Sequence, residues 1–150
     1  MKFFLDELTK VAIVKTINAI NLVEASLNKI KPYDPTRLYT PDEMEPYDAL
    51  SDRFVRGVES AIKFFRTYER AQFAEVSETI RDLFNRMEKL NMISSVELWL
   101  FMRDIRNRIV HDYLPEQLKE IYDLLTGPYG EELLTLKKKL QELQNKMNNN

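Results

Sequence analysis

An arginine and the chain's single histidine stand close together in Arg106-Asn107-Arg108-Ile109-Val110-His111. An imidazole titrates near neutral pH and can accept or donate a proton. The arginine guanidinium is permanently charged and binds phosphate oxygens with two parallel N–H groups. Asn107 precedes His111 by one helical turn and can orient a ring nitrogen or a substrate group. These are the groups that cleavage of RNA without a metal requires.

In such a reaction a base removes the proton of the ribose 2′-OH, whose oxygen then attacks the adjacent phosphate. A cation stabilises the charge that develops on the phosphorane-like transition state, and the product carries a 2′,3′-cyclic phosphate. The residue types alone leave a second interpretation open. A histidine near a helix C-terminus also interacts favourably with the helix dipole. Arginines usually lie at protein surfaces, and this chain has ten of them.

The segment from Ser95 to Tyr113 is predicted to be the helix that carries these residues. On a helical wheel one side is apolar and belongs in the core. The opposite arc is cationic and polar, with apolar residues beside it, which indicates a second contact surface. The expected core side consists of Leu98, Phe101, Met102, Ile105 and Ile109. The opposite arc holds Arg103, Arg106, Asn107 and His111, with Trp99, Leu100 and Val110 in it or beside it.

Helical periodicity and few glycines predict an all-α fold, an up-and-down bundle of about five to six helices. Residues 31–48 hold four prolines and form an irregular connection, in which Thr40-Pro41-Asp42-Glu43 is a capping box that starts a short helical turn. Asn91 is expected to end a helix in the left-handed conformation, and Ser94 to Glu97 form a second capping box. The predicted helices cover 4–30, 51–73, 76–90, 95–113, 115–125 and 131–147.

The last helix carries heptad-like spacing at Leu133, Leu136, Leu140, Leu143 and Met147. This spacing is typical of a helix that packs on its own bundle, but it also fits a helix that packs on a partner chain. The segment 131–150 is thus predicted to be an amphipathic helix whose closing asparagines, Asn148 to Asn150, are frayed.

Composition narrows the class of protein. A chain of 150 residues predicts a single domain, 1–150, and the absence of cysteine excludes disulfides and thiolate metal sites. The apolar run from Phe3 to Leu5 is too short for a signal peptide, and no stretch is long enough to span a membrane, so we expect a cytoplasmic protein.

The net charge of −2 is unusual for a nucleic-acid binder, so any contact with RNA would require a local basic patch. With no glycine-rich phosphate loop and no paired histidines, we expect no cofactor and no metal.

The string Arg106-Asn107-Arg108-Ile109-Val110-His111-Asp112-Tyr113 resembles the motif of HEPN ribonucleases, in which an arginine and a polar residue precede a histidine. Tyr113, two positions after the histidine, makes it similar to the HepT branch, toxins that pair with a minimal nucleotidyltransferase antitoxin (MntA). The resemblance covers most of the chain and is weakest beyond Gly130.

The resemblance implies a symmetric homodimer in which Arg106 and His111 of both chains form one cleft that cleaves tRNA or mRNA. A two-fold axis would also supply the second histidine that acid–base cleavage needs. Trp99, Leu100 and Val110 would be apolar neighbours at that interface. Arg103 and Arg108 would add phosphate contacts. Tyr113 would accept AMP from the antitoxin, and the added phosphodiester could occupy the position of the scissile phosphate beside Arg106.

Two alternatives remain open at this point. The chain could be a non-catalytic nucleotide- or substrate-binding partner of a nucleotidyltransferase, as related helical proteins are. It could also be a helical adaptor. The regularly spaced leucines of the C-terminal segment and the acidic composition support this alternative.

Overall fold

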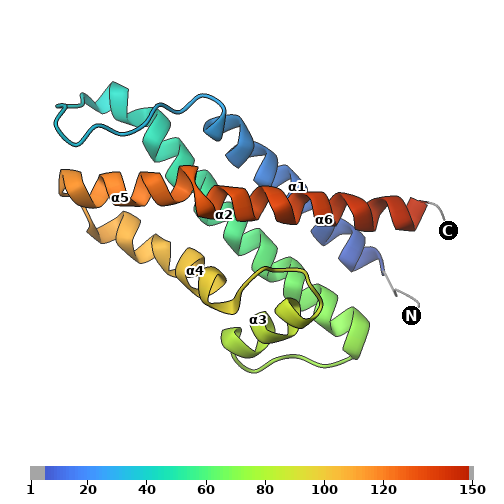
Figure 1. The fold of residues 1–150 in the computed structure, drawn as a ribbon. Coiled ribbons are helices and arrows are strands. Elements are labelled where there is room, and N and C mark those ends of the chain that lie inside the picture. Colours follow the sequence, from blue (N-terminus) through green and yellow to red (C-terminus); the bar gives the residue numbers. More distant parts are fainter. Residues whose placement is uncertain (1–5, 149–150) are drawn as a thin grey trace.

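The structure is a computed structural model that describes residues 6–148. Within this range the chain folds into six α-helices and no strand, which confirms the predicted all-helical class. Figure 1 shows them as a bundle in which α1 and α2 form a long antiparallel pair. The helices are α1 (Glu7–Leu27), α2 (Pro41–Phe73), α3 (Ile80–Lys89), α4 (Val96–His111), α5 (Pro115–Thr126) and α6 (Pro128–Asn148).

Helix α2 is longer than the sequence pattern predicts. Thr40 and Glu43 form the expected capping box, but the helix that starts there continues to Phe73 instead of ending as a short turn before 51. Pro46 lies inside it. At the sixth helical position, Pro46 cannot donate the hydrogen bond to the carbonyl four residues before it, and burial of Tyr47 and Leu50 just after it favours helix here.

Helices α3 and α4 begin later than predicted because carboxylates from other helices hold the preceding residues. The third helix was expected from 76, but Ser77 donates its backbone N–H to Glu69 at 2.7 Å, and α3 begins after its N-cap Thr79. Asn91 adopts the predicted left-handed conformation, with φ of 58°.

Helix α4 is capped by Ser95 and not by Ser94, because both the N–H and the hydroxyl of Ser94 donate to the carboxylate of Glu132. The helix ends at His111, two residues before the predicted end at Tyr113.

Helices α5 and α6 run almost in line, with only Gly127 between them (Figure 1). Pro128 is the first residue of α6 and not part of a connection, as proline favours the first helical position. The leucines at 133, 136, 140 and 143 are all buried in the core of this chain. Helix α6 therefore packs on its own bundle, which is one of the two interpretations that the heptad-like spacing of its leucines left open. The side chain of Met147 and residues 149–150 lie outside the part described.

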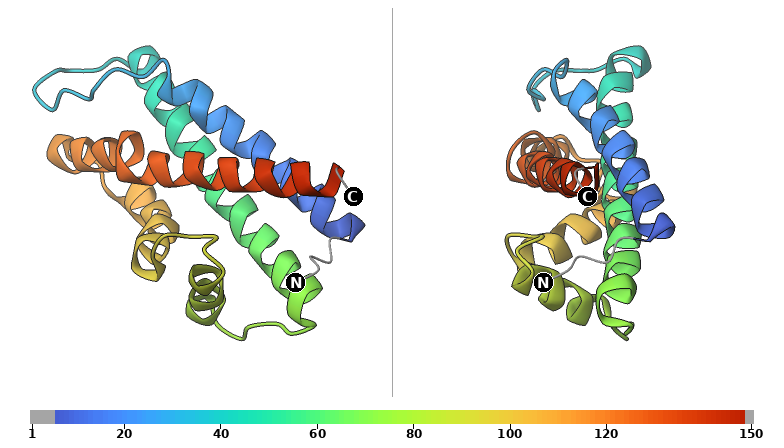
Figure 2. Two further views of the ribbon diagram at one scale, coloured as in Figure 1. Left: turned by 45° about the vertical axis from the view of Figure 1, so that its right-hand side comes forward. Right: turned by 90° about the vertical axis from the view of Figure 1, so that its right-hand side faces the viewer.

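The core lies between the α1–α2 pair and the layer formed by α4, α5 and α6, and Figure 2 shows this layering from the side. Helix α6 packs against α1, and α4 packs against α2 and α3. Aromatic rings fill the space between α2, α3 and α4, where Phe65, Phe84 and Trp99 meet edge to face. None of the described helices is both long and apolar enough to cross a membrane.

Tyrosines hold the connection between α1 and α2 against the bundle. Tyr33 stacks on Tyr39 with ring centroids 4.8 Å apart and also contacts Tyr47 and, from α5, Tyr122. The Tyr47 hydroxyl donates to the carbonyl of Lys31 at 2.8 Å. Burial raises the pKa of both Tyr47 and Tyr122 to about 12.

These tyrosines predict a loss of stability at alkaline pH. Their pKa is higher in the folded chain than in the unfolded chain, so their contribution is complete below about pH 10 and is lost as the pH rises towards about 12. The substitution Tyr122→Phe should reduce the slope of unfolding free energy against pH in this window by up to about 1.4 kcal/mol per pH unit. Urea unfolding followed by circular dichroism between pH 9 and 12 measures it, and an unchanged slope would contradict the assignment.

Candidate functional site

The rotation of α4 about its axis is fixed by Trp99. This side chain is fully buried, and its indole N–H donates to Oε1 of Glu132 at 3.0 Å. The prediction that Trp99 lies beside the motif at a partner surface is therefore wrong. Phe101, predicted to be in the core, is 61% exposed. The buried stripe of the helix consists of Val96, Trp99, Met102 and Ile105.

The remaining apolar predictions for α4 hold in part. Leu98 and Ile109 are half-buried and pack against the core, and so does Leu100, which was placed beside the opposite arc. Val110 is 69% exposed, on the arc opposite the core as predicted. With Trp99 buried, the opposite arc presents mainly polar and charged groups.

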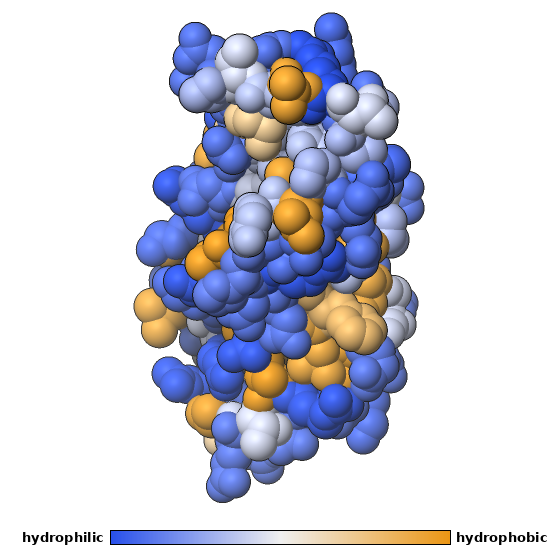
Figure 3. All heavy atoms as spheres, turned by 90° about the vertical axis from the view of Figure 1, so that its left-hand side faces the viewer, coloured by the Kyte–Doolittle hydropathy of each residue, from blue (hydrophilic) through white to orange (hydrophobic). Residues whose placement is uncertain are grey.

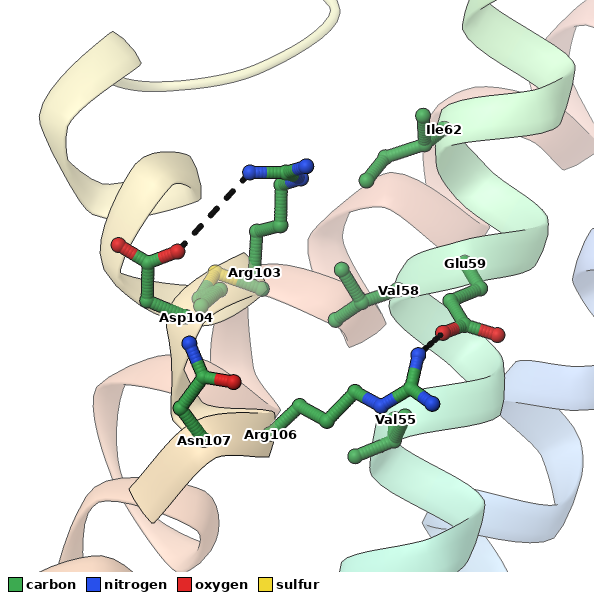
Figure 4. A pocket seen from close by; sticks show the side chains of 9 residues that line it. Val55, Val58, Glu59, Ile62, Arg103, Asp104, Arg106 and Asn107 are labelled. Atoms are coloured by element: carbon green, nitrogen blue, oxygen red, sulfur yellow. Dashed lines mark hydrogen bonds and ion pairs between the residues drawn. The ribbon is translucent and has the colours of Figure 1, made fainter. Parts of the chain in front are cut away.

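Arg106 reaches across a groove between α4 and α2 (Figure 4). Its Nη1 lies 2.9 Å from Oε1 of Glu59, and both side chains are at least half exposed, at 65% and 50%. The groove has a volume of about 180 Å³. Val55, Val58 and Ile62 of α2 form its apolar side. Arg106 thus lies at the surface, and within residues 6–148 its counter-ion is the exposed Glu59.

Arg103 and Asn107 line the same groove as Arg106. Both side chains are exposed, and the nearest carboxylate oxygen to the Arg103 guanidinium is that of the adjacent Asp104, at 4.0 Å. The structure therefore brings together three of the predicted residues, two guanidinium groups and an amide, on one exposed face.

His111 and Tyr113 lie beyond the groove, at the end of α4. His111 is the last helical residue and is exposed, and Tyr113 is 79% exposed in the connection to α5. Neither side chain lines the groove that contains Arg106. Five positions along a helix turn a side chain by about 140°, so within one chain Arg106 and His111 diverge.

Arg108 has a different environment from the other arginines of the motif. Its Nε lies 3.1 Å from Asp112 and its Nη1 lies 3.0 Å from Glu120 of α5. Burial lowers the pKa of this guanidinium, but the hydrogen bonds to Asp112 and Glu120 outweigh that and raise it. Arg108 thus joins the end of α4 to α5, and a contact with phosphate would have to displace one of these carboxylates.

Glu59 and the apolar side of the groove were not found from the sequence. The sequence does indicate that these residues share one face of α2, because Val55, Glu59 and Ile62 are spaced four and three positions apart. Without the fold, nothing indicates that this face lies opposite Arg106. Among the described residues no group of three or more histidine, aspartate and glutamate side chains is placed to hold a metal ion.

The fold and this site define a small all-helical protein with an exposed arginine, asparagine and histidine at the end of one helix. Residues 13–142 match the family model described as nucleotidyltransferase substrate binding protein like. The chain belongs to this family.

Among curated proteins, the chain is similar to the transcription-repair-coupling factor of Haemophilus influenzae, with 26% identity over 100 residues. The match covers 65% of this chain but only 9% of that protein's length. No solved structure matches the chain.

The exposure of the Arg106–Glu59 pair predicts that it adds little to stability. Exposed ion pairs contribute up to about 1 kcal/mol, so Glu59→Gln should change the free energy of unfolding by less than about 1 kcal/mol. Urea denaturation measures this change. A loss of several kcal/mol would mean that Arg106 is a structural residue and not free to bind a ligand.

Proposed function

We propose that this protein is the toxin of a pair formed with a nucleotidyltransferase antitoxin, and that it is a metal-independent endoribonuclease. One observation carries the proposal: Arg106, Asn107 and His111 are all exposed on α4, whose core contacts are made by other residues, and Tyr113 is exposed just after this helix. The bundle does not use these side chains for packing. Family membership supports the association with a nucleotidyltransferase.

The divergence of Arg106 and His111 within one chain supports a two-fold dimer. In such a dimer the motif helices of two copies face each other, and Arg106 of one copy approaches His111 of the other. One imidazole then removes the proton of the 2′-OH, and the other protonates the leaving 5′-oxygen. Arg106 leaves Glu59 and binds the phosphate oxygens as charge develops on them.

Tyr113 is the proposed site of inhibition. Its phenol oxygen attacks the α-phosphorus of ATP bound to the antitoxin, the bond to pyrophosphate breaks, and the phenolic proton is released. The product is an AMP ester of Tyr113. The exposure of this side chain, at 79%, makes it accessible to a second protein, and the new anion would compete with RNA for the nearby cations.

A second candidate function is a non-catalytic subunit that binds substrate for a nucleotidyltransferase, as the family description suggests. The adaptor alternative has less support than before, since the described leucines of α6 are buried in this chain's own core. RNA cleavage distinguishes the toxin from the non-catalytic subunit.

Purified protein should cleave single-stranded RNA with EDTA present. Either Arg106→Ala or His111→Ala should lower the rate at least about 100-fold, because each removes a group used in the transition state. Cleavage of a labelled RNA, with detection of the 2′,3′-cyclic phosphate end, measures this.

Arg81→Ala is the matched control, since Arg81 is also an exposed arginine that pairs with a glutamate of another helix at 2.9 Å. This variant should cleave like the wild type. Cleavage that survives both motif substitutions rules out the proposed site, and no cleavage by the wild type favours the substrate-binding subunit.

Co-expression with the cognate nucleotidyltransferase should add the mass of one or more adenylates to this protein. Tyr113→Phe should abolish the addition while leaving RNA cleavage within about threefold of wild type, because the phenol oxygen is the acceptor and takes no part in proton transfer. Intact mass spectrometry reads the modification. Tyr39→Phe, which changes another partly exposed tyrosine, is the control, and adenylates that persist on Tyr113→Phe would contradict the assignment.

A further inference from the structure

The connection between α1 and α2 borders a second, open cavity, distinct from the groove at Arg106. Its volume is about 330 Å³, within the range of small-molecule sites. Residues of the connection and of the start of α2 line it, and no residue of α4 does. A long connection without regular structure is commonly functional when it is ordered, and this one is ordered by the tyrosine contacts described above.

Three layers stack at this cavity. Tyr33 covers one face of Tyr39, with the two rings only 11° from parallel, and the guanidinium carbon of Arg37 lies 4.8 Å from the centre of the Tyr39 ring. Because Tyr33 occupies one face of Tyr39, the guanidinium takes the other. The Arg37 side chain is 52% exposed, so it forms the outer layer. Nucleobases stack on guanidinium planes and on tyrosine rings.

The charged groups that line the cavity leave positive charge available. Glu43 of α2 pairs with Arg37, and Asp34 accepts from the N–H and hydroxyl of Thr36 but keeps its negative charge. Lys29 and Lys31 also line the cavity, and neither ammonium group has a hydrogen-bond or ion-pair partner within residues 6–148. Burial raises the pKa of Tyr33 and Tyr47, so these phenols are neutral at physiological pH and do not offset the lysines.

We propose that this cavity binds a mononucleotide, with the base against the Arg37–Tyr39 stack and the phosphate on Lys29 and Lys31. An exposed guanidinium plane, supported by tyrosine rings and next to unpaired ammonium groups, suits a ligand that carries both a flat ring and an anion. The hydrogen bond from Tyr47 to the Lys31 carbonyl holds the site in shape before the ligand arrives, which lowers the entropy cost of binding. The site does not depend on the proposed ribonuclease activity.

Isothermal titration calorimetry of the full chain with AMP tests the proposal. AMP should bind, while adenosine and ribose 5-phosphate, which each lack one half of the ligand, should bind at least about tenfold more weakly. The double substitution Lys29→Gln and Lys31→Gln should weaken AMP binding at least about tenfold, because charge-assisted contacts to phosphate are lost. Both lysines are exposed, so this variant should fold like the wild type.

The matched control is Lys15→Gln with Lys63→Gln, which removes the same charge from exposed positions on α1 and α2 and should bind AMP like the wild type. His111→Ala should also bind AMP normally, which separates this site from the ribonuclease. In NMR spectra AMP should shift the amide signals of residues 29–47 and leave those of 103–113 in place. The proposal is overturned if AMP does not bind, if it shifts only 103–113, if the lysine variant binds unchanged, or if RNA binds at 29–47 and AMP does not.

Discussion

Glu132 of α6 lies almost buried between the bundle and the start of α4, where it accepts three hydrogen bonds. Two come from the backbone and hydroxyl of Ser94 and one from the indole of Trp99. Burying a carboxylate costs free energy unless the group is fully hydrogen-bonded. Moving Ser94 or Trp99 away from Glu132 would therefore destabilise the fold. These hydrogen bonds fix where α4 begins and which side of it faces the core, and thereby which residues the helix presents at its surface.

The exposed face of α4 follows from that rotation. With Trp99 turned inward, Arg103, Arg106 and Asn107 line the groove against α2, and the apolar side of the groove is supplied by Val55, Val58 and Ile62. An arginine held only by an exposed carboxylate can exchange that partner for a phosphate at little cost. The same helix places its histidine at the far end, so one copy of the chain presents the two halves of the motif in different directions.

The two cavities lie at different positions along α2. The groove at Arg106 is built from the middle of α2 and from α4, whereas the cavity at Arg37 is built from the connection between α1 and α2 and the start of α2, and is kept in shape by tyrosine packing. Figure 3 views the end of the molecule at the left of Figure 1, where this connection and the start of α5 lie. Its surface is mainly hydrophilic, with isolated apolar residues and one larger contiguous apolar area in the lower right of the view.

The sequence by itself determined the helical class, most of the helices, the capping box at Thr40 and the left-handed end at Asn91. These features depend on periodicity and on contacts between residues close in the chain. It also placed Arg106, Asn107 and His111 on one helix. Tertiary structure decided the continuous helix through Pro46, the start of α4 at Ser95 and the burial of Trp99, because each depends on packing or on a carboxylate distant in sequence. Glu59 faces Arg106 for the same reason: periodicity shows which residues share a face, and only the fold shows which faces meet.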